Sequence, residues 1–180
     1  RPFPLVRNKS LNIAALLRKK EGDRELEFAM VQVPSVLPRI VVLPETERPD
    51  GSRLRHVILL EEVIERNMTQ PFLNYDIIPP HPFRIMRNAH FSLDEEEAVD
   101  LLEEIEKQLK KRQWGEVIRL EIQEKPDKRL LKVLKKELMV NEEDIFQIPG
   151  ALDLTFLMKM YGMEGFDHLK TPGYTPQPVP

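Results

Sequence analysis

The sequence predicts a single domain built on a mixed β-sheet that is covered by helices. Three observations favour this fold. Extended apolar segments come first and then alternate with helical patterns, which is the element order of a mixed sheet covered by helices. A long amphipathic helix with a defined start, face and end lies between two of the extended segments. The 180 residues can bury one core but are few for two independent domains.

The first apolar segments are expected to pair as a β-hairpin. Residues 11–17 and 26–33 are separated by a polar turn. The first run, LNIAALL, could equally be helical, because a short continuous apolar run shows neither the period of a strand nor that of a helix. A short strand at 39–43 follows between prolines, and prolines there favour the edge of a sheet.

The next stretch should form a loop, a strand and a helix. Residues 45–53 are polar and contain an Asp-Gly turn signal, and residues 56–59 are extended enough to begin a strand. From Leu60 onward, apolar residues recur on one helical face as far as Pro71, which ends the helix. The prolines of YDIIPPHP then disfavour a helix and predict an extended segment.

The central unit, residues 81–123, is expected to form a strand, a helix and a second strand. Ser92 and Glu95 have the spacing of a capping box, which begins the helix. Its apolar stripe consists of Ala98, Leu102, Ile105 and Leu109. Acidic residues come early in this helix and basic residues late, which complements the helix dipole. The helix ends near Trp114, and Gly115 offers a left-handed stop.

The last third of the chain should contain two more helices and a closing strand. Pro126 precedes a helix over residues 127–139, whose leucines share one face. Asn141 could cap a short acidic turn that leads into a strand at 145–148. Apolar spacing over 154–161 predicts a short final helix.

Composition disfavours several classes of protein. The net charge of −3 argues against a dedicated duplex nucleic-acid binder, which normally carries a basic excess. The absence of cysteine excludes disulfides, thiol catalysis and thiolate metal sites, and it fits a reducing cytoplasm. No apolar run approaches the length of a transmembrane helix, and no signal peptide is visible. We therefore expect a cytoplasmic location.

The usual catalytic and metal-binding patterns are missing from the sequence. The seven glycines form neither a dinucleotide-binding motif nor a P-loop, and no serine lies in a nucleophile elbow. The acidic run at 94–97 is better explained by the helix dipole than by a metal site. The histidines form no close ligand pair, which favours structural roles. They are His56, His81, His90 and His168.

Two groups of basic residues are candidates for contact with an anionic polymer. Arg18, Lys19 and Lys20 belong to a locally basic amino-terminal stretch. Arg84 and Arg87 lie in the central extended segment. The alternatives are purely structural: a solvated turn for the first group and salt bridges on the sheet surface for the second. These alternatives stay open at the level of sequence.

Five segments in the same order resemble the middle, or head, domain of bacterial polyphosphate kinases. They are SLNIAALL, VPSVLPRIVVLP, LLEEVI, HPFRIMRNAHFSLDEEEAVDLLEEIEKQLKKRQWGEVIRLEI and GALDLTFLMKMYG. The resemblance runs nearly end to end, and the five together are specific although each alone is weak. Small departures from the family pattern are Met86 in place of threonine, His90 in place of an acidic residue and Ile40 in place of an aromatic residue.

The resemblance implies a whole enzyme that reversibly transfers the terminal phosphate of ATP to polyphosphate through a phosphohistidine, with magnesium. It places that histidine, the phosphate-binding arginines and the metal ligands in catalytic domains beyond Pro180. No catalytic, cofactor-binding or metal-binding residue is therefore expected in this chain, and the isolated fragment should be inactive. Residues 1–170 would be the middle domain and 171–180 a proline-rich connector toward the catalytic domains.

The resemblance also implies the fold class, an α+β fold with a three-layer α/β/α arrangement and a mixed β-sheet, which agrees with the order of elements predicted above. The family's head domain is associated with dimer formation and with docking against the catalytic domains. The resemblance thus implies a scaffold within a homo-oligomer, a dimer or higher, of a cytoplasmic parent enzyme whose association with a membrane is left open. A module that binds polyphosphate or nucleotide through its basic residues is the alternative. An independent small enzyme is disfavoured because no nucleophile and base are found together.

Overall fold

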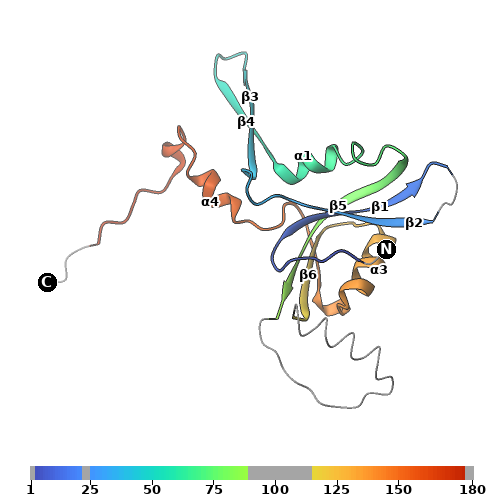
Figure 1. Ribbon diagram of the computed structural model, residues 1–180. Coiled ribbons are helices and arrows are strands. Elements are labelled where there is room, and N and C mark those ends of the chain that lie inside the picture. The colour runs from blue at the N-terminus through green and yellow to red at the C-terminus, as the bar shows by residue number, and fades with distance from the viewer. Residues whose placement is uncertain (1–2, 22–24, 89–114, 177–180) are drawn as a thin grey trace.

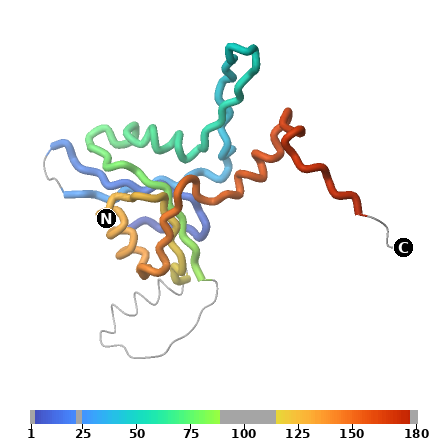
Figure 2. Tube along the Cα trace, turned by 180° about the vertical axis from the view of Figure 1, so that it is seen from behind, coloured from blue at the N-terminus to red at the C-terminus, as the bar shows by residue number. Residues whose placement is uncertain are grey.

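The computed structural model describes residues 3–21, 25–88 and 115–176 of the chain (Figures 1 and 2). In these residues the strands are β1 (Leu11–Lys19), β2 (Leu26–Gln32), β3 (Ile40–Glu47), β4 (Arg53–Leu59), β5 (Tyr75–Arg87), β6 (Val117–Gln123) and β7 (Ile145–Ile148). The helices are α1 (Leu60–Arg66), α3 (Lys128–Leu138) and α4 (Phe156–Tyr161), with 3-10 turns at Glu142–Asp144 and Asp167–Leu169. One mixed sheet has the order β2-β1-β5-β6-β7, while β3 and β4 form a separate two-stranded sheet.

The main sheet has helices on both faces, which confirms the predicted α+β fold. Figure 1 shows α1 over one face and α3 over the other. Along β1, Ala14 and Leu16 belong to the apolar cluster that includes the leucines of α3. The alternate residues Ile13 and Ala15 belong to a second cluster, against which α1 packs. Two cores therefore lie on opposite faces of a single sheet, because successive side chains of a strand point in opposite directions.

The predicted hairpin is present, and its first strand explains why the sequence alone left that strand ambiguous. β1 and β2 pair antiparallel, with Ala15 opposite Ala29. Residues 11–17 of β1 are all buried. A strand that is covered on both faces has no polar side to alternate with, so LNIAALL reads as a continuous apolar run.

The proline-rich segment at the start of β5 is extended, as predicted, yet it lies inside the sheet between β1 and β6. A register shift makes this possible. Ala14 lies opposite His81 but Leu16 lies opposite Ile78, so the intervening Pro79 and Pro80 face only Ala15. Proline cannot donate a backbone hydrogen bond, and the irregularity leaves these two residues outside the regular ladder.

Two predicted boundaries are wrong in the first half of the chain. The polar loop expected at 45–53 is shorter, because β3 continues to Glu47 and β4 already begins at Arg53. The turn itself has the expected chemistry: Gly51 has a φ of 81°, and its N–H donates to the carbonyl of Arg48 at 2.9 Å. Helix α1 ends at Arg66 rather than near Pro71.

The elements after β6 follow the prediction with one exception. Asp127 caps α3, since its side chain accepts from the N–H of Arg129 at 2.8 Å. β7 pairs parallel with β6, which makes the sheet mixed. Asn141 does not cap the acidic turn with its side chain. Instead, its carbonyl accepts a hydrogen bond from the N–H of Asp144 at 3.2 Å.

The long helix predicted over 92–114 lies outside the described residues, as do His90 and the acidic run at 94–97. The two strands expected to flank it are confirmed as β5 and β6, which pair antiparallel. Gly115, predicted to adopt a left-handed conformation, has a φ of 74°. No helix in the described ranges combines the length and apolar character needed to span a membrane.

Candidate functional site

Six charged side chains form a continuous series of ion pairs between the main sheet, α1 and the segment that leads into α4. We call this series the junction network. Its members, in order of contact, are Glu61, Arg39, Asp153, Arg84, Glu121 and Arg119. Acidic and basic residues alternate, so each member is within 4 Å of at least one side chain of opposite charge.

Arg39 lies at the centre of the more buried end of this network. Its Nη2 lies 2.5 Å from Oε1 of Glu61, and its Nε donates to both carboxylate oxygens at 3.2 and 3.1 Å. Only 15% of the Arg39 side chain and 5% of the Glu61 side chain are exposed. The same guanidinium donates to the carbonyls of Leu152 and Asp153 and lies 4.8 Å from the ring centroid of Phe156. One arginine therefore joins α1 to the start of α4.

Arg84, one of the predicted polyanion contacts, belongs to the other end of the network. Its Nη1 lies 3.2 Å from Oδ1 of Asp153, and its Nε lies 3.4 Å from Oε2 of Glu121. The second approach is an ion pair without hydrogen-bond geometry. Glu121 faces Arg84 directly across the β5–β6 ladder and also accepts from Nε of Arg119 at 2.8 Å. Arg84 thus makes salt bridges, as the alternative interpretation of the sequence had it, but in a largely buried position, since 12% of its side chain is exposed.

Arg87, the second candidate on β5, binds backbone carbonyls rather than carboxylates among the described residues. Its guanidinium donates to the carbonyl of Val6 at 3.2 and 3.4 Å and to that of Gly115 at 2.9 Å. Its own backbone N–H donates to Oδ1 of Asn8 at 3.0 Å. Burial of the guanidinium lowers the pKa of Arg87. The residue thus ties the amino-terminal segment to the end of the β5–β6 pair.

The amino-terminal candidates lie at the opposite end of the β1–β5 pair. Lys19 forms an ion pair with Glu27 at 3.0 Å, and Nζ of Lys20 donates to the carbonyl of Leu73 at 2.9 Å. The side chain of Arg18 is exposed and makes no hydrogen bond or ion pair with another described residue.

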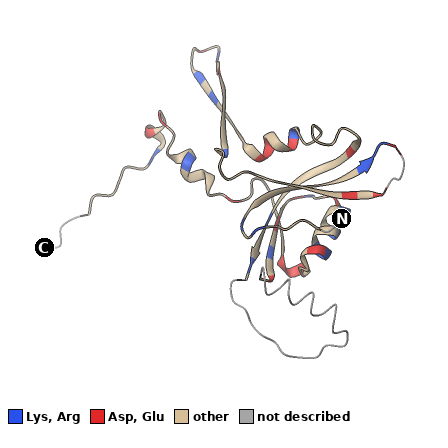
Figure 3. Ribbon diagram, viewed as in Figure 1, with Lys and Arg blue, Asp and Glu red and all other residues tan. Residues whose placement is uncertain are grey.

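The structure does not bring the two basic groups together. In the β1–β5 register Arg18 lies opposite Asp76, whereas Arg84 lies opposite Leu11 at the other end of β1. Figure 3 shows lysines and arginines scattered over the described elements and interspersed with acidic residues. The prediction that these residues contact a polyanion remains a prediction.

The histidines of the described residues lie apart from one another. Nε2 of His56 lies 2.7 Å from the hydroxyl of Thr46. The ring nitrogens of His81 lie 3.0 Å from the carbonyl of Pro79 and 3.2 Å from that of Lys125. His168 is exposed in the last 3-10 turn.

Magnesium has no suitable donor set in the described part of the chain. No three histidine, aspartate or glutamate side chains there are close enough to hold a metal ion. The carboxylates of the junction network are neutralised by arginines, which occupy the oxygens that a cation would need. We therefore assign no step of a magnesium-dependent reaction to these residues.

Glu65 is the carboxylate with the most raised pKa among the described groups. Burial of its side chain on α1 raises the pKa to about 7, and the nearby charges of Glu61 and Glu62 add to the effect. Its Oε1 is buried and has no hydrogen-bond partner. Arg39 neutralises Glu61 but makes no contact with Glu65, so the carboxyl of Glu65 is most stable in its neutral form near pH 6.

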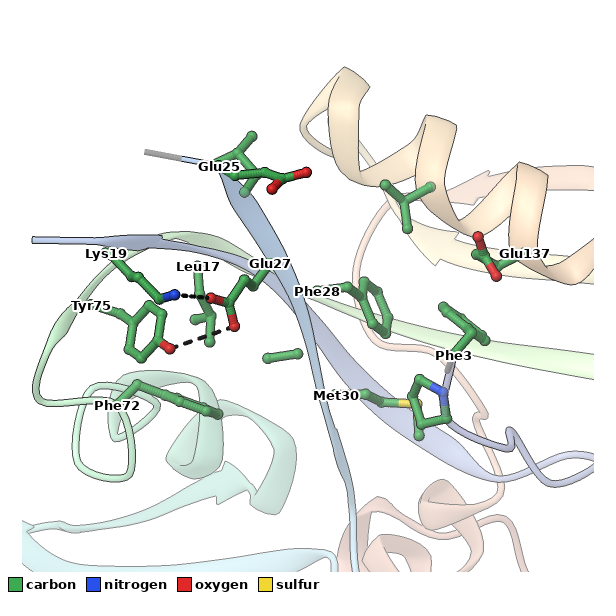
Figure 4. A pocket seen from close by; sticks show the side chains of 14 residues that line it. Phe3, Leu17, Lys19, Glu25, Glu27, Phe28, Met30, Phe72, Tyr75 and Glu137 are labelled. Atoms are coloured by element: carbon green, nitrogen blue, oxygen red, sulfur yellow. Dashed lines mark hydrogen bonds and ion pairs between the residues drawn. The ribbon is translucent and has the colours of Figure 1, made fainter. Parts of the chain in front are cut away.

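A cavity of about 980 Å³ follows the strand β2 and opens on both sides of it (Figure 4). Neither this cavity nor the junction network was anticipated from the sequence. The network joins single charged residues in separate segments, and Arg39 lies 114 positions from Asp153. No local motif marks such a pairing. Only the register of β5 with β6 and the position of residues 152–153 bring its members together.

Comparison with known proteins assigns this chain to a family. The sequence profile described as "Polyphosphate kinase middle domain" matches residues 1–160. A polyphosphate kinase from Halalkalibacterium halodurans is 45% identical, over 99% of this chain and 25% of that protein. One from Exiguobacterium sibiricum is also 45% identical, over 94% of this chain and 23% of that protein. The chain thus spans about a quarter of the length of the curated relatives it matches.

The fold agrees with a solved structure from the same family. The crystal structure of polyphosphate kinase from Porphyromonas gingivalis superposes with a TM-score of 0.64, over 98% of this chain and 23% of that chain. The sequences are 18% identical, so this similarity concerns the fold alone.

Proposed function

Since the chain belongs to the family of polyphosphate kinase middle domains, we propose that it serves a polyphosphate kinase as a non-catalytic scaffold. In this role it docks against the other domains of the enzyme and contributes to a homo-oligomer, a dimer or higher. The catalytic histidine, the phosphate-binding groups and the magnesium ligands belong to polypeptide outside these residues.

The observation that carries this proposal is the use of three arginines, two on β5 and one just before β3, for internal contacts. Arg39 and Arg84 are engaged by carboxylates, and Arg87 is engaged by backbone carbonyls. A guanidinium that binds phosphate must present free donors to the ligand. These three side chains instead hold segments of the domain to one another, which is the work of a scaffold.

The whole enzyme, on this proposal, transfers the terminal phosphate of ATP to polyphosphate in the cytoplasm, through a phosphohistidine and with magnesium. The middle domain comprises residues 1–170, and residues 171–180 form the connector to the catalytic domains. The proline content of this last segment supports the assignment, because proline-rich connectors are stiff and extended.

Phosphate transfer and self-association are the measurements that test this role. The chain is incubated with ATP, polyphosphate and magnesium, and ADP is quantified. We expect no ADP above a control without protein, and ADP formed in proportion to protein would refute the non-catalytic role.

Light scattering over a range of protein concentrations then tests oligomerisation. A mass that rises toward twice the monomer is expected, and a monomer at every concentration would count against self-association of this domain alone.

A second candidate function rests on Arg18. It is an exposed cation without a described partner beside Lys19 and Lys20, so the end of β1 could meet a polyphosphate or nucleotide. Replacing Arg18 and Lys20 with glutamate would abolish such binding. The matched change at Lys132 and Lys136, which are on α3, would leave it intact.

A further inference from the structure

The short helix α4 is apolar on both of its faces. Its six residues, FLMKMY, contain a single charge, at Lys159. On the inner face Phe156 is buried and Met160 is half-buried, and the ring centroid of Phe156 lies 4.8 Å from the guanidinium of Arg39. A helix that is apolar all round is normally covered on every side. The described residues cover only one of the two faces.

We call the other side the outer face of α4. It consists of Leu154, Leu157, Met158 and Tyr161, and between 44% and 77% of each residue's surface is exposed. The spacing of these positions makes their side chains neighbours on one helical surface. The N–H of Leu157 donates to the carbonyl of Leu154 at 3.0 Å, which places Leu154 in the same turn. A contiguous exposed apolar surface of this kind marks a contact with another protein surface.

Both ends of α4 are fastened to the rest of the domain. Before the helix, the guanidinium of Arg39 donates to the carbonyls of Leu152 and Asp153. After it, Nη1 of Arg55, which is on β4, donates to the carbonyl of Glu164 at 2.6 Å. The outer face is therefore held in one orientation, and a partner that binds it does not have to order this segment first.

The position of α4 in the chain indicates which polypeptide covers the outer face. In the curated relatives about three quarters of the protein lies outside the part that matches this chain. Figures 1 and 2 both show the described chain running on from α4, away from the main sheet, as far as residue 176. The polypeptide that follows in a parent protein therefore begins on the side of α4.

A tethered domain has a large advantage over a partner that arrives from solution. Residues 162–180 follow the outer face, and an extended chain of this length reaches at most about 65 Å. A short tether that can span two surfaces holds them at an effective concentration on the order of 1 mM. A second copy or a separate protein at about 1 μM has roughly a thousandth of that concentration. At equal quality of contact, the tethered domain occupies the face.

We propose that the outer face of α4 is the surface on which the domain that follows this chain in the parent polypeptide docks, through an apolar patch of its own. The proposal rests on the scaffold role proposed above and deepens it, because it names the docking surface and its occupant. Leu157 and Met158 supply the centre of the contact. The junction network then connects the docked domain to the main sheet, since Arg39 joins the start of α4 to α1 and Asp153 joins it to β5.

Oxidation of Met158 by hydrogen peroxide tests whether the outer face is covered. An exposed methionine is converted to its sulfoxide faster than a buried one, and mass spectrometry of the digested protein quantifies each residue. We expect Met158 to react at least about tenfold more slowly in the full-length parent than in this chain. Met68, which is 2% exposed, should react slowly in both proteins and serves as the control for folding. Equal rates for Met158 would overturn the proposal and leave the scaffold role standing, because the ADP assay tests that role separately.

Two results with this chain alone would assign the outer face to a different occupant. Oxidation of Met158 that slows as the concentration of the chain rises would identify a second copy. Oxidation that is slow at every concentration would mean that residues of this chain cover the face themselves. Each of these results overturns the proposal.

A photo-crosslinking residue identifies the occupant directly. Leu157 of the full-length parent is replaced with p-benzoylphenylalanine, and the irradiated protein is analysed on a denaturing gel and by peptide mass spectrometry. We expect a product that keeps the mass of one polypeptide and joins residue 157 to a segment after Pro180. A product of twice that mass, a crosslink to any other segment, or no crosslink would overturn the proposal. Leu73, which is 72% exposed in the turn before β5, is the matched site and should not crosslink to the segment that residue 157 reaches.

Discussion

The guanidinium of Arg39 and the carboxylate of Glu61 meet at 2.5 Å in a part of the molecule nearly closed to solvent. Arg39 precedes β3 and Glu61 lies in the first turn of α1, while the remaining donors of Arg39 bind the carbonyls of Leu152 and Asp153. The pair therefore satisfies a buried carboxylate and also fastens the segment that leads into α4. Removing either residue of such a pair is strongly destabilising, because the other residue is then left charged and buried without a counter-charge.

Removal of Arg39 should be among the most destabilising single changes in the chain. Arg39→Met leaves Glu61 buried without a counter-charge and also frees two carbonyls, so we expect a loss of about 3–5 kcal/mol in the free energy of unfolding. Urea unfolding measures it. Arg53→Met is the matched control, because Arg53 is 78% exposed and lies 3.9 Å from Glu45. It should cost less than about 1 kcal/mol, and equal losses would contradict the assigned role of Arg39.

Neutralising Asp153 should loosen α4 more than it destabilises the sheet. Asparagine tolerates the left-handed conformation found at this position, where φ is 51°, and it keeps an acceptor for Thr155. Asp153→Asn removes only the charge that faces Arg39 and Arg84. We expect faster hydrogen exchange in α4 and a loss of about 1–2 kcal/mol. Asp167→Asn, which alters an exposed pair with Lys170, should leave exchange in α4 unchanged.

Glu65 should make the stability of the domain depend on pH. Its pKa is about 7 in the folded protein and 4.5 in the reference state, so the folded state binds more protons between these values. The contribution of Glu65 to the stability of the domain should therefore be highest below pH 4.5 and should be lost as the pH rises through 7. After allowance for partial exposure, the loss is about 1 kcal/mol.

The substitution Glu65→Gln tests this pH dependence. The variant should be more stable than the wild type at pH 8 and about equal to it near pH 5. Glu143→Gln, in the exposed acidic turn, changes the net charge by the same amount. Its free energy of unfolding should depend on pH as steeply as that of the wild type. If the stability of Glu65→Gln depended on pH as steeply as that of the wild type, other groups would be responsible for the pH dependence.

Two glycines with positive φ should respond differently to alanine. At Gly115 an added Cβ would lie 2.3 Å from the carbonyl oxygen of Asn88, whereas at Gly51 it would meet nothing within 4 Å. Both substitutions strain the backbone by about 1 kcal/mol. Gly115→Ala adds a clash with the end of β5, so it should cost about 2 kcal/mol more than Gly51→Ala. Thermal unfolding of the two variants gives the comparison, and equal costs would mean that the chain shifts freely at Gly115.

The elements that the sequence predicted well are those specified by neighbouring residues. Helix α3 follows from Pro126, the capping Asp127 and leucines at helical spacing, and all of these act within a few residues. β1 was ambiguous because both of its faces are buried. The end of α1 was misplaced because apolar residues such as Met68 continue the helical spacing beyond Arg66, where the chain leaves the helix to bury them in turns.

The candidate site could not be predicted to the same degree, because its residues come together only through tertiary structure. Arg84 and Arg87 were named as candidate contacts for a polyanion, which stays a prediction, with salt bridges on the sheet surface as the alternative. Their actual partners depend on the β5–β6 register and on the path of residues 3–8. Arg39, which has the most buried ion pair among the described residues, has no sequence signal at all. It is one arginine beside a proline in an apolar stretch.

The most direct test of the scaffold role is calorimetric titration of the chain with polyphosphate at low salt. Because the sheet arginines are engaged by carboxylates and carbonyls, we predict no heat of binding beyond dilution, and no change when Arg18 and Lys20 are replaced with glutamate. Micromolar binding that weakens with added salt, and that is lost in the Arg18→Glu and Lys20→Glu double variant, would contradict this account and establish the domain as a polyanion-binding module.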